Sequence, residues 1–360
     1  MKYNPLTRSP AHPLTTLYAV ILAGGPGERF WPVSRVKNPK YAMHIAGPKS
    51  IIEQTVARVQ GLIPNRNILI VTTKEQIALV RKKLKGTGAR NFLIEPCPRD
   101  TAAAIGLAAA YIGKRGPLAT MVVLPADHYI KDKKGFQSTV KKAIKAADKE
   151  RLVTIGIKPT YPATGYGYIK IKGHQVTRSP GHQYYEVERF VEKPDKATAQ
   201  KFLRSKRYFW NSGMFIWKVD TILDSIKNHM PQLYKVLIRS GKDYKKLKKI
   251  SIDYGVMEKS RSKAMVQAEF DWIDLGSWIS LAKICKKDKS GNVSKGCSIN
   301  CDTKGSVIIS SKKHLVAATG VKNLVIVHTK DATLVADKNK SQEIKRLVAL
   351  IRKKGLKRYL

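Results

Sequence analysis

Residues 17–32 read LYAVILAGGPGERFWP. The first seven of these residues form a continuous apolar run, which is typical of a strand buried on both faces of a sheet. Gly24, Gly25 and Gly27 follow at once, and glycines at such a turn let backbone N–H groups approach an anion closely. Arg29 can fork onto phosphate oxygens. The stretch therefore predicts a buried strand followed by an anion-binding loop. The alternative is a tight turn without a ligand.

Two common nucleotide-binding patterns do not fit this loop. No Gly-Lys-Ser/Thr sequence follows the glycines, which excludes the P-loop of nucleoside triphosphatases. Phe30 stands where the dinucleotide fingerprint requires its third glycine, which excludes that motif as well. If the loop holds an anion, it does so in another kind of fold.

Short apolar runs alternate with helical segments on the C-terminal side of the loop. The runs at 68–71, 121–124 and 152–157 have the length of strands, and helical spacing occupies the segments at 51–62, 75–84, 101–112 and 135–149. This alternation predicts an α/β fold with a mostly parallel sheet.

The pattern changes twice towards the C-terminus. Aromatic-rich strands are expected at 166–171, 184–191 and 209–218, and a helix at 218–237. After about Gly291, polar turns separate four short apolar strands, which predicts a small all-β unit closed by a basic amphipathic helix at 343–353. The four strands are expected at 306–310, 315–318, 324–328 and 333–336.

The charge of the chain is strongly unbalanced. Its 360 residues suggest two domains, and 43% hydrophobic with 26% charged residues excludes a largely disordered chain. Lys and Arg number 68 against 26 Asp and Glu, a formal net charge of +42 that attracts polyanions and small anionic substrates. A nucleic-acid role and a lysine bias on solvated surfaces both remain open. Few aromatic residues interleave with the basic clusters at 245–249 and 353–358, so we expect no specific nucleic-acid partner.

Neither a zinc site nor a membrane span is expected. Cysteines at 97, 285, 297 and 301 form no CxxC pair, and no apolar run reaches the roughly 20 residues of a spanning helix. Residues 1–16 lack the apolar core of a secretory signal. With so few cysteines, these features favour a cytoplasmic protein.

Two aspartates are candidate metal ligands. Asp127 follows the apolar run at 121–124, and ligands collect at the carboxyl ends of strands. Asp274 lies in the sequence DWIDLGSW at 271–278. Mg²⁺ prefers one or two carboxylates together with substrate phosphates. The alternative for each aspartate is that its side chain caps a turn or the start of a helix. We expect His128, the next residue after Asp127, to be structural.

A third group of residues suits a phosphorylated sugar. Glu192 can accept hydrogen bonds from hydroxyl groups, and Lys193 can contact a phosphate. Asn211 can both donate hydrogen bonds to hydroxyl groups and accept them. A surface ion pair is the alternative for Glu192 and Lys193. Gly165, in the sequence TGYGYI at 164–169, gives the backbone freedom for close contact.

Taken together, these segments resemble the mannose-1-phosphate guanylyltransferases, the GDP-mannose pyrophosphorylases of the sugar nucleotidyltransferase superfamily. The resemblance covers residues from about 17 to 350 and rests on eight motifs in the order and spacing of the family. They are Leu22–Pro32, Pro39-Lys40, Leu124–His128, Thr164–Ile169, Glu192–Pro194, Asn211–Phe215, Ile252–Lys259 and Asp274–Trp278.

This resemblance implies an α/β fold: a Rossmann-like nucleotidyltransferase domain with a mixed central sheet, plus a small C-terminal β-helix-like domain. We expect a tail at 1–16, the catalytic domain at 17–288, and the β-rich domain with its terminal helix at 289–360. The same resemblance implies that GTP and mannose 1-phosphate give GDP-mannose and pyrophosphate with Mg²⁺ as cofactor, and a homodimer is the assembly we expect.

Site roles are also implied by the resemblance. Asp127 and Asp274 would ligate Mg²⁺. Arg29 would hold the departing pyrophosphate, and Lys40 would stabilise charge on the reacting phosphates. The nucleotide would contact Leu22, Ala23, Gly24, Gly25, Gly27 and Arg29, and the sugar phosphate would contact Gly165, Glu192, Lys193 and Asn211.

Two segments depart from the family pattern. Tyr41 stands where the family usually has Gln, and Asp-Thr-Ala-Ala at 100–103 replaces the common Asn-Thr-Ala-Pro. The second segment lies close to the base in relatives, so this departure bears on guanine selectivity. One rival hypothesis keeps the chemistry with another sugar or nucleotide. Another is a basic nucleic-acid-binding or regulatory protein on an enzyme fold that has lost its activity.

Overall fold

The computed structural model describes residues 16–25, 27–45, 47–148, 150–177, 183–239 and 243–360. The tail expected at 1–16 lies outside the described residues, apart from Thr16. The chain forms two compact units, each built from three segments. Of the described residues, the first contains those up to Val20, Arg99–Val123 and Val140–Val266, and the second contains Ile21–Pro98, Leu124–Thr139 and Gln267–Leu360.

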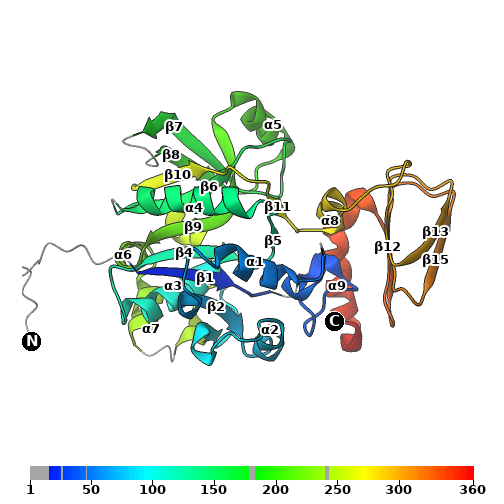
Figure 1. The fold of residues 1–360 in the computed structure, drawn as a ribbon, viewed down its shortest axis with the longest axis horizontal. Helices are drawn as coiled ribbons and strands as arrows, with labels where there is room; N and C mark the ends of the chain where they lie inside the picture. Colours follow the sequence, from blue (N-terminus) through cyan, green and yellow to red (C-terminus); the bar gives the residue numbers. More distant parts are fainter. Residues whose placement is uncertain (1–15, 26, 46, 149, 178–182, 240–242) are drawn as a thin grey trace, which may run out of the picture. The chain divides into compact units, whose positions relative to one another are not determined.

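The strands and α-helices are numbered in chain order, and Figure 1 labels those for which there is room. The helices are α1 (Ile51–Val59), α2 (Ile77–Lys83), α3 (Asp100–Gly113), α4 (Lys133–Ala147), α5 (Lys196–Ser205), α6 (Val219–His229), α7 (Pro231–Ile238), α8 (Trp278–Ile284) and α9 (Ile344–Lys353). The strands before α8 are β1 (Leu17–Leu22), β2 (Ile68–Thr73), β3 (Phe92–Glu95), β4 (Thr120–Pro125), β5 (His128–Tyr129), β6 (Leu152–Ile157), β7 (Tyr168–Thr177), β8 (Gln183–Val191), β9 (Tyr208–Lys218), β10 (Lys263–Gln267) and β11 (Ile273–Asp274). The C-terminal strands are β12 (Val293–Lys295), β13 (Cys297–Cys301), β14 (Val307–Ile309), β15 (Leu315–Thr319), β16 (Leu324–His328) and β17 (Thr333–Asp337).

Nine of these strands form one mixed sheet in the order β3-β2-β1-β4-β9-β6-β10-β8-β7. The apolar run of β1 lies in it with Ala19, Val20 and Ile21 fully buried, as a strand covered on both faces requires. Parallel pairing of β2 with β3 fits the alternating pattern of the sequence. A mixed sheet, as the resemblance implied, is therefore confirmed.

The expectation of a mostly parallel sheet is wrong for the half of the sheet that contains β7, β8, β9 and β10. Strand β9 runs antiparallel to β4 and β6, and β8 runs antiparallel to β7 and β10. The physical reason lies in the connections, because a short link such as that between β7 and β8 cannot make the crossover that parallel strands need. The single helix expected at 218–237 is also two helices. Pro231 lacks the N–H that would continue α6 and instead occupies the first turn of α7.

The C-terminal strands wind as a β-helix-like stack. Strands β12, β14 and β16 pair in parallel, β13 pairs in parallel with β15, and β17 closes the stack antiparallel to β16. Val293, Val307 and Val325 lie in register on neighbouring strands, and all three are buried. These valines join a core cluster that also contains Phe30 and Trp278, so the C-terminal strands share a core with the segment after β1 and with α8.

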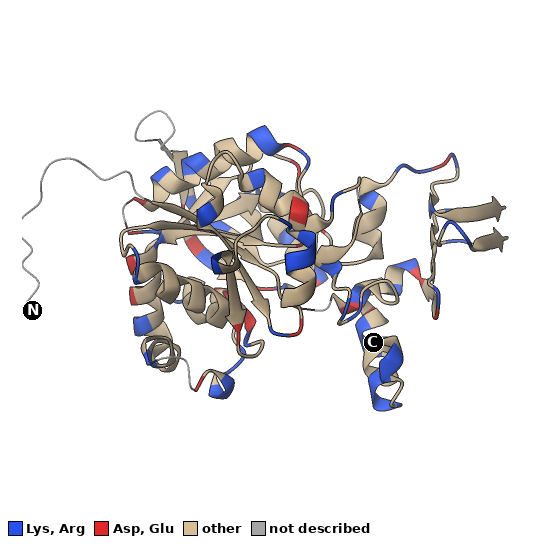
Figure 2. Cartoon of the chain, turned by 60° about the horizontal axis from the view of Figure 1, so that its bottom comes forward, with Lys and Arg blue, Asp and Glu red and all other residues tan. Residues whose placement is uncertain are grey.

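Figure 2 shows Lys and Arg along helices and loops throughout the chain rather than in a single stripe. Among the described residues, none of the helices combines the length and the apolar character that crossing a membrane would require.

Candidate active site

The glycine-rich loop leaves β1 in the second unit and is held from both sides. The backbone N–H of Ala23 donates to the Val71 carbonyl over 2.8 Å, and the Ser34 hydroxyl donates to the Gly27 carbonyl over 2.6 Å. Gly27 has a φ of +68°, and a Cβ added there would collide with the Cβ of Lys40. Only glycine satisfies both conditions without strain, so the loop and Lys40 are packed together through Gly27.

Lys40 lies between the two aspartates expected to bind metal. Its Nζ atom is 2.7 Å from Asp127 Oδ2 and 3.3 Å from Asp274 Oδ1. The Lys40 side chain is 9% exposed, whereas the side chains of Asp127 and Asp274 are 37% and 29% exposed. The structure therefore brings these three residues into one cluster, with the carboxylates accessible and the ammonium group covered.

A two-stranded antiparallel ladder explains how the aspartates meet. Strand β5 pairs with β11 so that Asp274 lies opposite His128, and Asp127 directly precedes His128. Trp272 Nε1 donates to His128 Nδ1 over 3.2 Å. The Asp271 carboxylate accepts the backbone N–H of Asp132 over 3.0 Å. These contacts give His128 and Asp271 structural roles, and they place the Asp274 carboxylate next to that of Asp127.

The charges in the cluster stabilise one another. Burial alone would lower the pKa of the Lys40 ammonium, but the Asp127 and Asp274 carboxylates outweigh burial and raise that pKa above its usual value. Burial would raise the pKa of the Asp127 carboxyl, and the Lys40 ammonium overcomes this and holds it below its usual value. One ammonium between two carboxylates leaves a net negative charge, which attracts a further cation.

The residues present fit a divalent metal that arrives with phosphates. Among the described residues, no group of three or more His, Cys, Asp or Glu side chains could hold a metal ion by itself. Asp127 and Asp274 supply two hard carboxylate donors, and Mg²⁺ completes such a set with substrate phosphates and water.

A pocket of about 320 Å³ opens beside the cluster within the second unit. Arg29 faces it: a Cβ built on Gly276 would lie 3.7 Å from Arg29 Nη1 and 3.5 Å from Asp274 Oδ2. Arg29 Nη1 therefore lies near the Asp274 carboxylate, and its role in binding phosphate remains a prediction. The lining residues are Gly27, Glu28, Arg29, Phe30, Lys40, Asp127, Gly276 and Lys345.

The expected sugar-phosphate residues form a second cluster, in the first unit. Lys193 Nζ pairs with Glu192 Oε1, and a Cβ on Gly167 would collide with Glu192 Oε2. Gly165 lies in an exposed loop with open space around it, so Gly167 is the glycine that packs against Glu192. The backbone N–H of Asn211 donates to the Gly167 carbonyl over 2.8 Å, which joins β9 to this loop.

Asp253 is the site residue that sequence reasoning did not single out. Asn211 Nδ2 donates to Asp253 Oδ1 over 2.7 Å, and the Asn211 amide oxygen accepts from Thr154 Oγ1 over 3.2 Å. Burial, followed by the nearby charge of Glu192, raises the pKa of Asp253 to about 6. The Ile252–Lys259 motif contained the signal, but only the fold shows that its aspartate meets Asn211.

Two family models match the chain over most of its length. A family model described as nucleotidyl transferase matches residues 18–291, and one described as the MannoseP isomerase/GMP-like beta-helix domain matches residues 296–350. A Klebsiella pneumoniae protein named mannose-1-phosphate guanylyltransferase is 37% identical over 359 residues, which cover 95% of this chain and 75% of that protein.

This chain belongs to the mannose-1-phosphate guanylyltransferase family. An Escherichia coli protein of the same name is 38% identical over 352 residues, covering 93% of this chain and 74% of the relative. A crystal structure described as a mannose-1-phosphate geranyltransferase from Thermus thermophilus superimposes with a TM-score of 0.85. It is 34% identical and covers 94% of this chain and 100% of that one.

The two departures from the guanylyltransferase pattern have clear places in the fold. The buried Tyr41 hydroxyl donates to Gln76 Oε1 over 2.9 Å, within the second unit. The Asp-Thr-Ala-Ala segment begins α3 in the first unit, where Thr101 Oγ1 accepts the Ile252 backbone N–H over 2.8 Å. This contact ties the start of α3 to the residue next to Asp253.

Proposed function

We propose that this chain is a mannose-1-phosphate guanylyltransferase that makes GDP-mannose and pyrophosphate from GTP and α-D-mannose 1-phosphate. The observation that carries the proposal is the cluster in which Lys40 contacts both Asp127 and Asp274 beside the glycine-rich loop. An anion-binding loop, a cation and two accessible carboxylates are the parts that a metal-bound triphosphate requires.

The nucleotide would lie over the glycine-rich loop. A Cβ atom built on Gly24 or Gly25 would meet nothing within 4 Å, so a phosphate can approach the backbone there. Leu22 ends β1 and Ala23 follows it, so these two residues fix where the loop begins. The exposed Arg29 would hold the departing pyrophosphate.

Catalysis would consist of positioning and charge stabilisation. An oxygen of the sugar phosphate attacks the α-phosphorus in line, and pyrophosphate leaves on the opposite side. Because this nucleophile is already anionic, no general base is needed. Lys40 and Arg29 offset the repulsion between the two substrates and the charge that develops on the leaving group. Removing one such group typically costs about 10²–10³ in turnover.

Asp127 and Asp274 would hold the divalent metal, which we propose to be Mg²⁺. When bound, Mg²⁺ neutralises charge on the phosphate oxygens and polarises the reacting phosphoryl group. The two carboxylates fix where this charge is placed. Lys40, 2.7 Å from Asp127 and 3.3 Å from Asp274, holds the pKa of the Asp127 carboxyl below its usual value.

The sugar phosphate would bind the cluster in the first unit. Glu192 and Asp253 would accept hydrogen bonds from sugar hydroxyls, and the 59% exposed Lys193 would contact the phosphate. Asn211 already uses its amide on Asp253 and Thr154, so its part would be to orient the Asp253 carboxylate.

A substrate panel tests the proposal. Pyrophosphate release is measured with each of the four common ribonucleoside triphosphates against mannose 1-phosphate and glucose 1-phosphate, with Mg²⁺ present. We expect GTP with mannose 1-phosphate to give the highest kcat/KM. A higher value for another pair would instead support the same chemistry on a different sugar or base. Release with none of the pairs would overturn the enzyme assignment.

The nucleic-acid-binding rival predicts a different result. Its support is the net charge of +42, and binding through charge alone weakens steeply as salt rises. Filter binding of mixed-sequence RNA between low and physiological salt separates the two. Salt-resistant, sequence-specific binding together with absent turnover would favour the rival.

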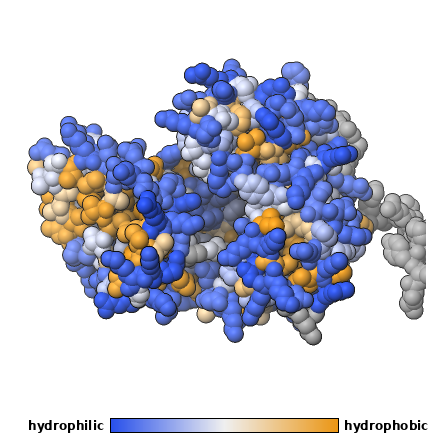
Figure 3. Space-filling view, turned by 180° about the vertical axis from the view of Figure 1, so that it is seen from behind, coloured by the Kyte–Doolittle hydropathy of each residue, from blue (hydrophilic) through white to orange (hydrophobic). Residues whose placement is uncertain are grey.

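A homodimer remains our proposal for the assembly. Ile299 on β13 and Leu315 on β15 point to one exposed face of this parallel pair and are 62% and 51% exposed. Figure 3 shows hydrophobic side chains gathered over the C-terminal strands. Size-exclusion chromatography with light scattering on wild type and Ile299→Asp tests it: a dimer that the substitution dissociates supports the proposal, and a wild-type monomer contradicts it. The cytoplasmic location also stays a prediction.

A further inference from the structure

Helix α9 begins at the edge of the nucleotide pocket. Ile344 and Val348, one helical turn apart, are buried in the cluster that contains Phe30 and Trp31. Lys345 follows the buried Ile344 and lines the same pocket as Arg29 and Lys40. The helix belongs to the C-terminal domain, yet its first turn presents a cation at the candidate triphosphate site.

The position of α9 relative to the loop is fixed by further contacts in the C-terminal part of the chain. Glu28 Oε1 lies 3.0 Å from Arg352 Nη2 on α9. Trp31 Nε1 donates to the carbonyl of Tyr359 over 2.8 Å. Glu28 and Trp31 flank the Arg29–Phe30 pair, so residues from the C-terminus hold the segment that carries Arg29 from both sides.

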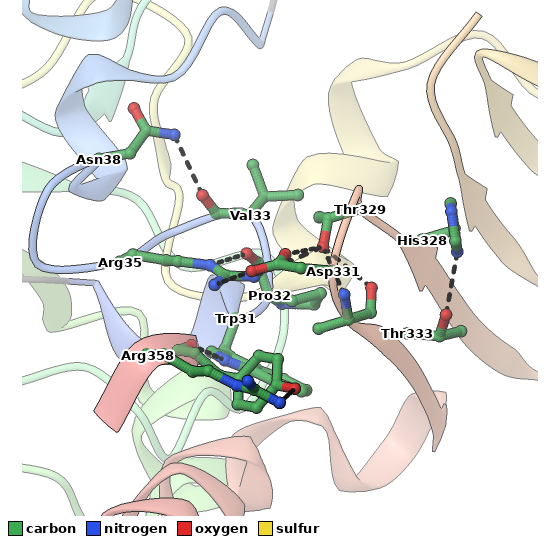
Figure 4. A network of polar contacts seen from close by, with 12 residues as sticks. Trp31, Pro32, Val33, Arg35, Asn38, His328, Thr329, Asp331, Thr333 and Arg358 are labelled. Carbon is green, nitrogen blue, oxygen red and sulfur yellow. Dashed lines mark hydrogen bonds and ion pairs between the residues drawn. The ribbon is translucent and has the colours of Figure 1, made fainter. Parts of the chain in front are cut away.

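A second connection, between Arg35 and Asp331, is shown in Figure 4. Arg35 Nη1 and Nη2 donate to the two carboxylate oxygens of Asp331 over 2.8 and 2.7 Å. Arg35 Nε also donates to the carbonyl of Pro32 over 2.9 Å. A bidentate pair of this kind fixes orientation as well as distance. Asp331 of the β-helix-like domain thereby holds the segment that follows the glycine-rich loop. Lys345 of the same domain lies beside that loop.

Among the described residues, two cationic side chains that line the pocket, those of Arg29 and Lys345, have no carboxylate partner. Lys40 is paired with Asp127 and Asp274, and Glu28 is paired with Arg352. Across the described part of the chain, neither Arg29 nor Lys345 has an ion pair or a side-chain hydrogen bond, and both side chains are exposed. A leaving pyrophosphate carries several negative charges, which is more than Arg29 alone offsets.

We propose that Lys345 binds the β- and γ-phosphates of the nucleotide and the departing pyrophosphate together with Arg29. The inference rests on the proposed function and adds to it a cation supplied by the C-terminal helix. The β-helix-like domain then has a part in substrate binding, because its contacts with Glu28, Trp31 and Arg35 hold Lys345 at the site. The competing explanation is a solvated lysine without a ligand, as Lys353 at the far end of α9 is.

The test compares Lys345→Ala, Lys345→Arg and the matched control Lys353→Ala, which removes one exposed charge from the same helix. Affinity for inorganic pyrophosphate with Mg²⁺ is measured by calorimetry, and KM is measured for GTP and for mannose 1-phosphate. We expect Lys345→Ala to weaken pyrophosphate binding about tenfold and to raise KM for GTP by a similar factor, since a charge-assisted contact contributes on this scale. KM for mannose 1-phosphate should stay the same, and Lys345→Arg should restore most of the loss.

Two different results separate the inference from the proposed function. Equal pyrophosphate affinity in Lys345→Ala and Lys353→Ala, with a wild type that makes GDP-mannose, would overturn the role of Lys345. A wild type without GDP-mannose formation would overturn the proposed function, whatever the pyrophosphate affinities are. Because Lys345 is exposed, its substitutions should leave the thermal unfolding of the chain unchanged.

Discussion

The Nζ atom of Lys40 lies 2.7 Å from Asp127 Oδ2, and the same ammonium reaches Asp274 at 3.3 Å. Three residues from separate parts of the chain therefore share one small volume next to the glycine-rich loop. Antiparallel pairing of β5 with β11 brings the two aspartates together, and the close packing of Gly27 on Lys40 adds the loop. The proposed chemistry depends on this arrangement.

Replacing either aspartate should remove most of the metal-dependent activity. Asn keeps the shape of Asp but has no charge to hold a divalent ion, so we expect Asp127→Asn and Asp274→Asn each to lower turnover by about 10²–10³. GDP-mannose formation is measured at saturating Mg²⁺. Asp243→Asn is the matched control, since its exposed carboxylate pairs only with Lys246 in the described structure. Wild-type turnover in both site variants would refute the metal assignment.

Removing the shared cation should make stability depend on metal. In Lys40→Met the carboxylates of Asp127 and Asp274 lose the charge between them, so they repel, and we expect unfolding to become easier by about 1–3 kcal/mol. Mg²⁺ should recover more stability in this variant than in wild type, because a divalent ion replaces the missing charge. Thermal unfolding with and without Mg²⁺ measures this effect, with the exposed Lys37→Met as control. An equal effect of Mg²⁺ on the thermal unfolding of Lys40→Met and of wild type would contradict this prediction.

Gly27→Ala should disturb Lys40 as well as the loop. The residue has a φ of +68°, and the added Cβ would collide with the Cβ of Lys40. We expect a loss of about 1–2 kcal/mol from backbone strain together with a turnover at least about tenfold lower. Gly61→Ala separates the two effects, because Gly61 has a φ of +87° but nothing within 4 Å of its Cβ position. It should lose stability and keep turnover. Equal turnover in both variants would contradict the packing argument.

The raised pKa of Asp253 should appear in the pH dependence of folding. Its folded pKa of about 6 exceeds the roughly 3.9 of an unfolded Asp, so the folded state binds more protons between about pH 4 and 6. The free energy of unfolding therefore falls as pH rises through this range, by about 3 kcal/mol from this group. Urea unfolding at several pH values should show the decline in wild type. In Asp253→Asn the decline should be smaller. A carboxyl resonance of Asp253 titrating near its unfolded value of about 4 would contradict this account.

Local sequence patterns were enough for the strand and loop at 17–32 and for most helices of the first half. They did not predict β3 or β10, which are short and were not distinguished from loops. The antiparallel half of the sheet depends on connections and tertiary pairing, which periodicity does not contain. Aspartates 127 and 274 could be named from the sequence, since both follow apolar or aromatic segments.

Other parts of the site could not be predicted because they depend on tertiary contacts. The pairing of Asn211 with Asp253 joins two distant segments of the chain, and neither residue alone indicates it. Lys345 is one lysine in a very basic chain, and only the fold shows that it lines the same pocket as Arg29 and Lys40. The domain boundaries at 17–288 and 289–360 remain predictions.

The most direct measurement is the binding of Mn²⁺, as a spectroscopically visible substitute for Mg²⁺, in the presence of GTP. Electron paramagnetic resonance counts free Mn²⁺ during titration of wild type, Asp127→Asn and Asp274→Asn. The account predicts a GTP-dependent metal site in wild type that weakens at least about tenfold in each variant, since each loses one charged ligand. Unchanged Mn²⁺ affinity in either variant would show that Asp127 and Asp274 do not share a metal ion.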